Sequence, residues 1–446
     1  MNKTVSFQTL GCKLNFSETS TIGNQFLQKG FSIVDIKEKA DVYVINTCTV
    51  TENAEKDCRQ FVRRVQRLNP KAYIIVAGCY AQLKAEEISA IEGVDAVLGS
   101  NEKFKIFDLI DEFEKEELSC IYVTPTDELD TFTSASSSNA DQRTRAYFKI
   151  QDGCDYKCTF CTIPLARGKS RSLEIEKTLI QFKKLVEQGY KEIILTGVNV
   201  GDYGKRIDTD FYSLLKELVK VDGDFRIRIS SIEPNLLTNE IIAFAKDNPK
   251  ISNHFHIPLQ SGSDKVLSLM QRRYNTADYR RVVQHAVSNI ENVGIGIDVI
   301  IGSPGETEED FLQTYNFIKE LPASYLHVFT YSERPNTKAI LMDGKIDIVE
   351  KKRRSSMLRI LSEKKKNEFY RKMIGKELKV LFEDSEKDGY LFGYSSNYVR
   401  VKHPFKTDLA NKFKMIKITD VVDNICVGEI AEEFFNKESK SISNYK

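Results

Sequence analysis

The chain contains 446 residues, of which 41% are hydrophobic and 29% charged, and its formal net charge is only +1. This balance excludes a fibrous or largely disordered protein, and the length indicates two or three domains because one hydrophobic core seldom organises so long a chain. No apolar run is long enough to cross a bilayer, and residues 1–12 lack the apolar core of a signal peptide. We therefore expect a cytoplasmic protein that has no membrane partner.

Residues 1–118 are predicted to form an α/β domain. Short apolar runs that end in a loop, namely VSFQTLGC, ADVYVINTC and AYIIVAGCYA, alternate with helical patterns such as SETSTIGNQFLQKG. Such alternation is typical of a parallel sheet. Residues 119–142 follow as a predicted linker, because the run SASSSNADQ is small, polar and without periodicity.

Residues 143–370 are predicted to form an open partial barrel of six strand and helix units. Helical patterns separate most of the candidate strands, which are AYFKIQDG, EIILTGVN, FRIRISSIEP, HFHIPLQSG, GIGIDVIIGSPGE and LHVFTYS. Residues 371–434 contain short alternating strands that predict a small all-β domain, and residues 435–446 are expected to be a flexible tail.

Charge is distributed unevenly along the chain. Residues 86–130 contain fourteen acidic residues against three lysines, whereas residues 351–376 contain eleven basic residues against two glutamates. The C-terminal part is therefore expected to attract a polyanion, unless these basic residues only solvate a helix face.

Three cysteines, Cys154, Cys158 and Cys161, follow the first strand of the predicted barrel with the spacing CxxxCxxC. Three thiolates can hold three irons of a 4Fe-4S cube and leave the fourth iron open to another ligand. A zinc knuckle is the alternative, but the sequence has no fourth Cys or His near this loop. The spacing therefore favours the cluster of a radical S-adenosylmethionine (SAM) enzyme, in which SAM occupies the open iron.

Three further cysteines, Cys12, Cys48 and Cys79, each end one apolar run of the N-terminal domain. Loops at the carboxyl ends of parallel strands converge, so these residues can meet at one site. Two of them follow a glycine, which allows close backbone approach. They either hold a second cluster or are buried structural thiols. The remaining cysteines fit neither pattern and are interpreted as structural: Cys58, Cys120 and Cys426.

From residue 9 to about residue 430 the chain resembles the radical SAM methylthiotransferases, on the motifs LGCKLN, INTCTVTENAEKDCR, GCYAQ, KIQDGCDYKCTFCTIPLARGKSRS and VIIGSPGET. The resemblance implies an N-terminal flavodoxin-like domain, a radical SAM partial (βα)6 barrel and a small C-terminal TRAM β-barrel that binds RNA. LGCKLN is similar to the MtaB-type branch, which acts on N6-threonylcarbamoyladenosine next to the tRNA anticodon. The isopentenyladenosine branch more typically has YGCQMN, and the branch that modifies a ribosomal protein has LGCPKN.

The resemblance also implies two 4Fe-4S clusters, a radical cluster on the CxxxCxxC loop and an auxiliary cluster on Cys12, Cys48 and Cys79. One SAM molecule would methylate a sulfur of the auxiliary cluster. A second would be cleaved to a 5'-deoxyadenosyl radical that removes hydrogen from C2 of the adenine, where methylthio is inserted. We expect three partners: the tRNA anticodon stem-loop, an electron donor such as flavodoxin or ferredoxin, and a sulfur donor.

Other site residues are expected around the radical cluster. SAM is held at the carboxyl ends of barrel strands, where turn and cap residues are also common, and the candidates are Thr196, Gly197, Asn199, Ser230, Glu233, Gln260 and Asp298. Arg167, which we count as catalytic, is expected with Lys169 and Arg171 to contact tRNA phosphate or the threonyl carboxylate. The C-terminal domain interleaves aromatic and basic residues in a way that suits RNA, although half of the aromatics must be core: Tyr390, Phe392, Tyr394, Tyr398, Lys379, Arg400 and Lys402.

Two other functions stay open at this point. One is the sister enzyme that acts on isopentenyladenosine in tRNA. The other is an RNA-binding iron-sulfur redox sensor whose clusters report redox state without turnover.

Overall fold

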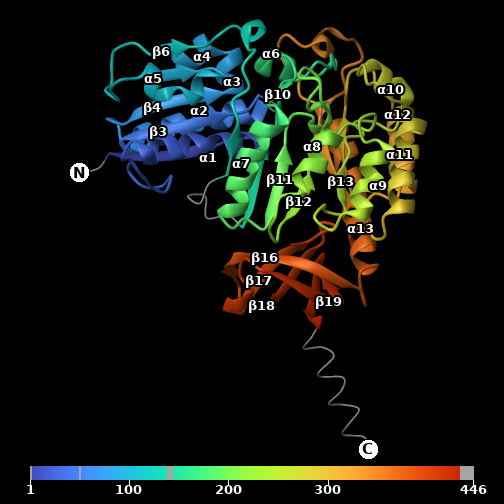
Figure 1. Ribbon diagram of the computed structural model, residues 1–446. Helices are drawn as coiled ribbons and strands as arrows, with labels where there is room; N and C mark the ends of the chain where they lie inside the picture. The colour runs from blue at the N-terminus through green and yellow to red at the C-terminus, as the bar shows by residue number, and fades with distance from the viewer. Residues whose placement is uncertain (1–2, 50–51, 138–143, 432–446) are drawn as a thin grey trace, which may run out of the picture.

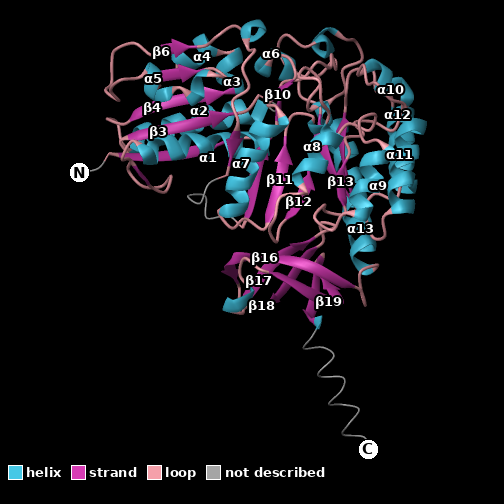
Figure 2. Ribbon diagram, viewed as in Figure 1, coloured by secondary structure: helices cyan, strands magenta, loops and turns pink. Residues whose placement is uncertain are grey.

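The computed structural model describes residues 3–49, 52–137 and 144–431. Three parts follow one another along the chain: a parallel α/β sheet, a partial barrel, and a small closed β-barrel (Figure 1). Colouring by secondary structure shows helices flanking the first two parts and strands dominating the third (Figure 2). The predicted fold class is confirmed. Within the described residues, no helix is both long and apolar enough to span a bilayer.

The N-terminal sheet has six parallel strands in the order β2-β1-β3-β4-β5-β6. The strands are β1 (Thr4–Thr9), β2 (Ser32–Ile33), β3 (Val42–Thr47), β4 (Tyr73–Gly78), β5 (Ala96–Leu98) and β6 (Cys120–Tyr122). The helices are α1 (Lys13–Gln28), α2 (Glu52–Leu68), α3 (Cys79–Leu83), α4 (Ala85–Ser89) and α5 (Ile106–Leu109). The first five strands have the 2-1-3-4-5 order of flavodoxin-like sheets, and β3 and β4 are buried along their whole length, as near-continuous apolar strands covered on both faces should be.

The segment expected to be a linker is partly regular structure. Its first residues form β6, which pairs with β5, and Ala135–Ser136 form β7, which runs antiparallel to β8 of the next domain. Residues 138–142 lie outside the described chain. Strands of two or three residues carry no periodicity, so the composition of this segment could not reveal them.

The partial barrel has six parallel strands, as predicted. They are β8 (Arg145–Lys149), β11 (Glu192–Thr196), β12 (Arg226–Ile229), β13 (His254–His256), β14 (Gly294–Ile301) and β15 (Tyr325–Thr330). Isolated bridges at Ile227–Ile251 and Ser231–His256 join the sheet that contains β8, β11 and β12 to the sheet that contains β13, β14 and β15. The surrounding helices are α7 (Ile175–Glu187), α8 (Phe211–Leu218), α9 (Asn239–Asp247), α10 (Asp264–Leu269), α11 (Thr276–Asn289), α12 (Glu308–Glu320) and α13 (Ile348–Arg371). Helix α1 packs against β7 and β8 and joins this barrel to the N-terminal domain.

The C-terminal domain is a closed five-stranded barrel in the order β16-β17-β18-β20-β19. Its strands are β16 (Glu377–Lys387), β17 (Tyr390–Ser395), β18 (Arg400–Pro404), β19 (Phe413–Val422) and β20 (Ile425–Ile430). It lies beneath the partial barrel in Figure 1.

Two buried arginines attach the small barrel to the partial barrel. Arg226 donates to the carbonyl of Tyr394 at 2.7 Å, and Arg228 donates to the carbonyls of Ser395 and Ser396 at 3.0 Å each. Both guanidinium groups also bind the buried carboxylate of Glu192. The attachment therefore combines a buried charge cluster with main-chain oxygens of β17 and the residue that follows it.

Candidate active site

The three strand-end cysteines of the N-terminal domain lie together. Cys12, Cys48 and Cys79 follow β1, β3 and β4, which are neighbours in the sheet. Gly11 has φ +100°, and a Cβ on it would lie 2.5 Å from the Cβ of Cys48 and 2.7 Å from its Sγ. Burial raises the pKa of the Cys12 thiol, Arg167 opposes this, and nearby Cys79 raises that pKa further. The structure thus brings these three thiols into one place, where their donor set suits an iron-sulfur cluster.

The CxxxCxxC loop follows β9 (Gln151–Asp152), which pairs with β10 (Arg171–Ser172). Gly153 has φ +69°, and a Cβ there would lie 2.0 Å from the carbonyl oxygen of Lys169, so the loop can leave β9 only with glycine at this position. The loop closes on itself because the N–H of Cys161 bonds the carbonyl of Cys158 at 3.1 Å.

The thiols of this loop lie in a desolvated place. Burial raises the pKa of Cys154 and Cys161 to about 12, and the charge of another cysteine in the loop contributes to each rise. Metal binding must therefore displace their protons, which is the usual coupling of thiolate ligation to proton release. The three donors fit the cluster of a radical SAM enzyme.

Arg272, which sequence patterns did not single out, contacts this loop from the segment that follows α10. Its Nη1 donates to Cys158 Sγ at 3.0 Å, and its Nη2 is ion-paired with Glu233. Burial raises the pKa of the Cys158 thiol, and Arg272 opposes that rise because it stabilises a thiolate. Glu233, expected as a SAM residue, therefore orients a cation against the radical-cluster cysteines.

Besides Asp298, whose Oδ1 is ion-paired with two histidines, four of the expected SAM residues carry a buried side-chain atom that has no hydrogen-bond partner in the described part of the chain. These atoms are Thr196 Oγ1, Asn199 Nδ2, Ser230 Oγ and Gln260 Oε1. They lie at or just beyond the carboxyl ends of β11, β12 and β13. Gln260 also has φ +65°, a backbone strain of the sort found at ligand sites. Buried polar atoms without partners are rare in folded proteins, so this set fits a polar ligand such as SAM.

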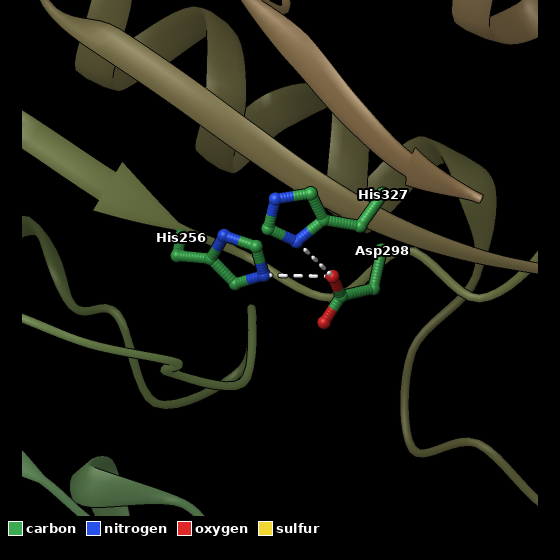
Figure 3. A group of neighbouring side chains, drawn as sticks. All are labelled: His256, Asp298 and His327. Carbon is green, nitrogen blue, oxygen red and sulfur yellow. Dashed lines mark ion pairs between the residues drawn. The ribbon is translucent and has the colours of Figure 1, made fainter. Parts of the chain in front are cut away.

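Gly197 and Asp298 complete the expected set. Gly197 packs against Gln151, whose Oε1 would lie 2.8 Å from a Cβ at that position. Asp298 points between two histidines on the adjacent strands β13 and β15: His256 Nε2 lies 2.8 Å and His327 Nδ1 3.3 Å from its Oδ1 (Figure 3). Burial alone would raise the pKa of Asp298, but the two histidines lower it below its usual range. The carboxylate is thus held ionised inside the barrel.

Comparison with known proteins agrees with this geometry. Residues 4–99 match the family described as Uncharacterized protein family UPF0004, and residues 148–318 match the Radical SAM superfamily. The chain is 40% identical, over 89% of its length and 96% of the relative, to threonylcarbamoyladenosine tRNA methylthiotransferase MtaB of Aquifex aeolicus. It is 41% identical, over 93% of each chain, to the protein of the same name from Bacillus subtilis. The chain belongs to the radical SAM methylthiotransferase family.

As a radical SAM methylthiotransferase, the protein is an enzyme of the transferase class that uses SAM and a 4Fe-4S cluster. The related tRNA-2-methylthio-N(6)-dimethylallyladenosine synthase of Fusobacterium nucleatum is 34% identical over 96% of this chain and all of that protein. The fold is similar to that of the radical S-adenosylmethionine methyltransferase TsrM from Kitasatospora setae, with a TM-score of 0.55 and 16% identity over 76% of this chain and 77% of that one.

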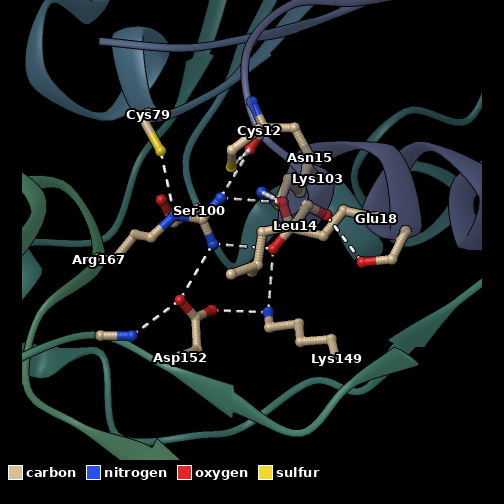
Figure 4. Close-up of polar contacts among 12 residues, drawn as sticks. Cys12, Leu14, Asn15, Glu18, Cys79, Ser100, Lys103, Lys149, Asp152 and Arg167 are labelled. Carbon is tan, nitrogen blue, oxygen red and sulfur yellow. Dashed lines mark hydrogen bonds and ion pairs between the residues drawn. The ribbon is translucent and has the colours of Figure 1, made fainter. Parts of the chain in front are cut away.

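The structure places Arg167 of this methylthiotransferase differently from our expectation. Its side chain is buried, and all five of its N–H donors are used within the protein, so it does not face tRNA (Figure 4). Arg171 is also buried and bonds the carbonyl of Thr131 at 2.9 Å. Of the three basic residues after the cluster loop, Lys169 is the exposed one. Of the partners that the sequence did not indicate, Glu18 and Asn15 on α1 lie 149 and 152 residues away, whereas Asp152 on β9 lies 15 residues away.

The aromatic residues of the C-terminal barrel divide into two groups. Tyr394 and Tyr398 face the partial barrel, where the guanidinium carbons of Arg145 and Arg228 lie 4.6 and 4.9 Å from their ring centroids. The second group places Lys402 over the Tyr390 ring at 5.2 Å and Arg400 over the Phe392 ring at 5.0 Å, and Arg400 links the two groups because it also donates to the Tyr394 hydroxyl at 2.7 Å. The second group keeps the combination of stacking and charge that suits RNA.

Proposed function

We propose that the enzyme converts N6-threonylcarbamoyladenosine next to the tRNA anticodon to its 2-methylthio derivative, using two 4Fe-4S clusters and two SAM molecules. The observation that carries this proposal is the pair of three-cysteine sites, at the sheet edge of one domain and on the first loop of the next. The LGCKLN wording and the 38–41% identity to three MtaB relatives support the substrate.

When bound, the clusters and SAM supply the radical, the methyl group and the sulfur, and the protein provides the positions. Cys154, Cys158 and Cys161 would hold the radical cluster, with Arg272 against one of their sulfurs. Cys12, Cys48 and Cys79 would hold the auxiliary cluster. Side chains at the ends of β11 to β13 would bind the polar groups of SAM. Such preorganisation matters because reacting groups must meet within about 3–3.5 Å.

Lys13 offers a specific reason for preferring this substrate. It directly follows Cys12, it is exposed, and within the described residues it has neither an ion pair nor a hydrogen bond. The surrounding protein lowers the pKa of Lys13, first by desolvation and then through the charges of Arg228 and Arg145, while Asp298 and Glu192 oppose that change. The threonylcarbamoyl group ends in a carboxylate, whereas an isopentenyl group has no charge. A free cation beside the auxiliary site therefore favours the carboxylate-bearing base.

The substrate is tested by expressing the chain in a bacterial strain that lacks its own methylthiotransferases and analysing digested tRNA by mass spectrometry. We expect 2-methylthio-N6-threonylcarbamoyladenosine to appear, and to be absent with Cys48→Ala. Lys13→Gln should raise KM for the tRNA while iron content stays unchanged, and Lys13→Arg should restore much of the affinity. Appearance of only the isopentenyl product would refute the substrate, and absence of any reductive SAM cleavage would favour the redox sensor.

The partners remain part of the same proposal. Exposed cations on the C-terminal barrel and α13 would meet the anticodon stem-loop. Turnover needs an electron donor, such as flavodoxin or ferredoxin, and a sulfur donor that restores the auxiliary site. All of these would be found in the cytoplasm, where the protein is expected to act.

A further inference from the structure

Arg167 is the last residue of α6 (Ile163–Arg167), on the radical SAM side of the domain boundary, yet its side chain reaches across to the N-terminal domain. Its Nε lies 3.2 Å from Cys79 Sγ. Nη1 donates to Glu18 Oε1 at 2.9 Å and to Asp152 Oδ1 at 3.0 Å. Nη2 donates to Asn15 Oδ1 at 2.8 Å and to Glu18 Oε2 at 3.0 Å. The guanidinium is thus fixed in position and orientation, with one N–H directed at a cysteine sulfur (Figure 4).

The partners of Arg167 belong to a buried charge cluster that is not balanced. Glu18 also binds Lys103 at 2.6 Å and Lys149 at 2.9 Å, and Asp152 binds Lys149 at 2.6 Å. Arg171 lies 3.5 Å from Asp152. Burial lowers the pKa of Lys103, but even without it the three cations Arg167, Lys149 and Arg171 face only the two carboxylates of Glu18 and Asp152, which leaves an excess of one positive charge. Buried charge without a counter-charge is costly, so this excess points to a missing anion.

The geometry shows where that anion belongs. The Arg167 Nε–H points away from both carboxylates and toward Cys79, which directly follows β4 and lies near Cys12 and Cys48. A thiolate that ligates iron is a negatively charged acceptor, and hydrogen bonds to ligand sulfur are one of the factors that set a cluster's reduction potential. A guanidinium stays charged under all ordinary conditions, so it serves as a permanent donor.

We propose that Arg167 is a positioning residue for the auxiliary cluster: its Nε–H donates to the Cys79 thiolate, fixes that ligand, and raises the reduction potential of the cluster. This inference rests on the second cluster of the proposed function. It also implies that the radical SAM domain sets the electronic properties of a cluster held by the other domain, since Arg167 follows the CxxxCxxC loop by only six residues.

Arg272 provides a matched comparison within the same chain. It places an N–H 3.0 Å from Cys158 Sγ and is held by the carboxylate of Glu233, so it repeats the arginine, carboxylate and thiolate arrangement at the radical site. Replacing either arginine by lysine keeps the charge but removes the planar array of donors. Each substitution should therefore affect one cluster alone.

The test uses a parent chain with Cys154, Cys158 and Cys161 all replaced by Ala, so that the auxiliary cluster is the one reconstituted. Redox titration followed by EPR should give a lower midpoint potential for this parent carrying Arg167→Lys than for the parent itself. The parent carrying Arg272→Lys should be unchanged. Loss of the cluster in Arg167→Lys with an unchanged circular-dichroism spectrum would also support the positioning role. An unchanged potential with full iron content would overturn it.

A second measurement needs no substitution at Arg167. The reduced parent, grown with 15N-arginine, should show a 15N coupling to the cluster in pulsed EPR, and exchange into D2O should reveal an exchangeable proton. Absence of the 15N coupling would overturn the proposal even if Arg167→Lys did not fold. A parent that binds no iron at all would instead refute the second cluster of the proposed function, and the inference with it.

Discussion

Gly11→Ala should remove the auxiliary cluster and leave the radical cluster in place. The new methyl group would lie 2.5 Å from Cys48 Cβ and 2.7 Å from its Sγ, whereas carbon atoms in contact are ordinarily about 3.5–4.0 Å apart. Cys48 or the Gly11 loop must therefore move by about 1 Å. Backbone strain should lower the folding stability by about a further 1–2 kcal/mol, because φ is +100° and an L-residue avoids positive φ. Typical domain stabilities are about 5–15 kcal/mol, so the protein should still fold.

Gly30→Ala is the matched control. Gly30 has φ +84°, so alanine there bears a similar backbone cost, but nothing lies within 4 Å of its Cβ. After anaerobic reconstitution we expect about eight irons per chain in the wild type and Gly30→Ala, and about four in Gly11→Ala. Reductive SAM cleavage should persist in all three, while methylthiolation by Gly11→Ala falls by about 100-fold or more. If Gly11→Ala matched Gly30→Ala in iron content and methylthiolation, the steric reasoning would be wrong.

Further predictions concern buried charge, pH and RNA. Glu18→Gln removes the carboxylate that pairs with three buried cations, so the free energy of unfolding measured in urea should fall by about 3–5 kcal/mol. A fall of less than about 1 kcal/mol would contradict the importance of the charge cluster. Burial would raise the pKa of Glu18, but Arg167, Lys103 and Lys149 lower it, so the stabilisation that its carboxylate provides is complete above about pH 5 and is lost as pH falls toward the folded pKa. Glu18→Gln should therefore reduce the fall in melting temperature at acid pH. Burial lowers the pKa of His254 well below its usual value, so below about pH 6.5 only the unfolded chain takes up a proton at this residue. The free energy of unfolding should therefore fall by about 1.4 kcal/mol for each pH unit below that point. Denaturation at pH 7.5, 6.5 and 5.5 should show this slope in the wild type, and His254→Asn should remove it. Lys402→Glu should weaken tRNA binding in filter assays and reduce the log-log salt slope by about 0.7–0.9, with iron content unaffected.

The sequence predicted which cysteines lie together because both cysteine groups have local signals. Cys48 and Cys79 end strands that are buried throughout, and such apolar runs are recognisable without a structure. The CxxxCxxC spacing is local by definition. Parallel pairing then makes strand ends converge, so the meeting of Cys12, Cys48 and Cys79 follows from the fold class alone.

The surroundings of these cysteines were less predictable because they depend on distant pairings. Arg167 was expected to contact tRNA phosphate or the threonyl carboxylate, since it follows the cluster loop. Its partner Glu18 lies 149 residues away and has no local pattern of its own. The same holds for Asp298, His256 and His327, which come from three separate strands: the HFHI run indicates only that alternate residues share one face.

The attachment of the small barrel has a consequence for how the protein can be altered. Arg226 and Arg228 bind main-chain oxygens of the small barrel, and the Tyr394 and Tyr398 rings contact Arg145 and Arg228, so the position of the domain depends on its inner face and on the partial barrel, with little contribution from side chains on its outer surface. Residues on the outer surface can then be exchanged one at a time without shifting the domain. Placement and recognition are separable properties here, and an altered RNA preference could be introduced into the barrel while its position relative to the cysteine sites is kept.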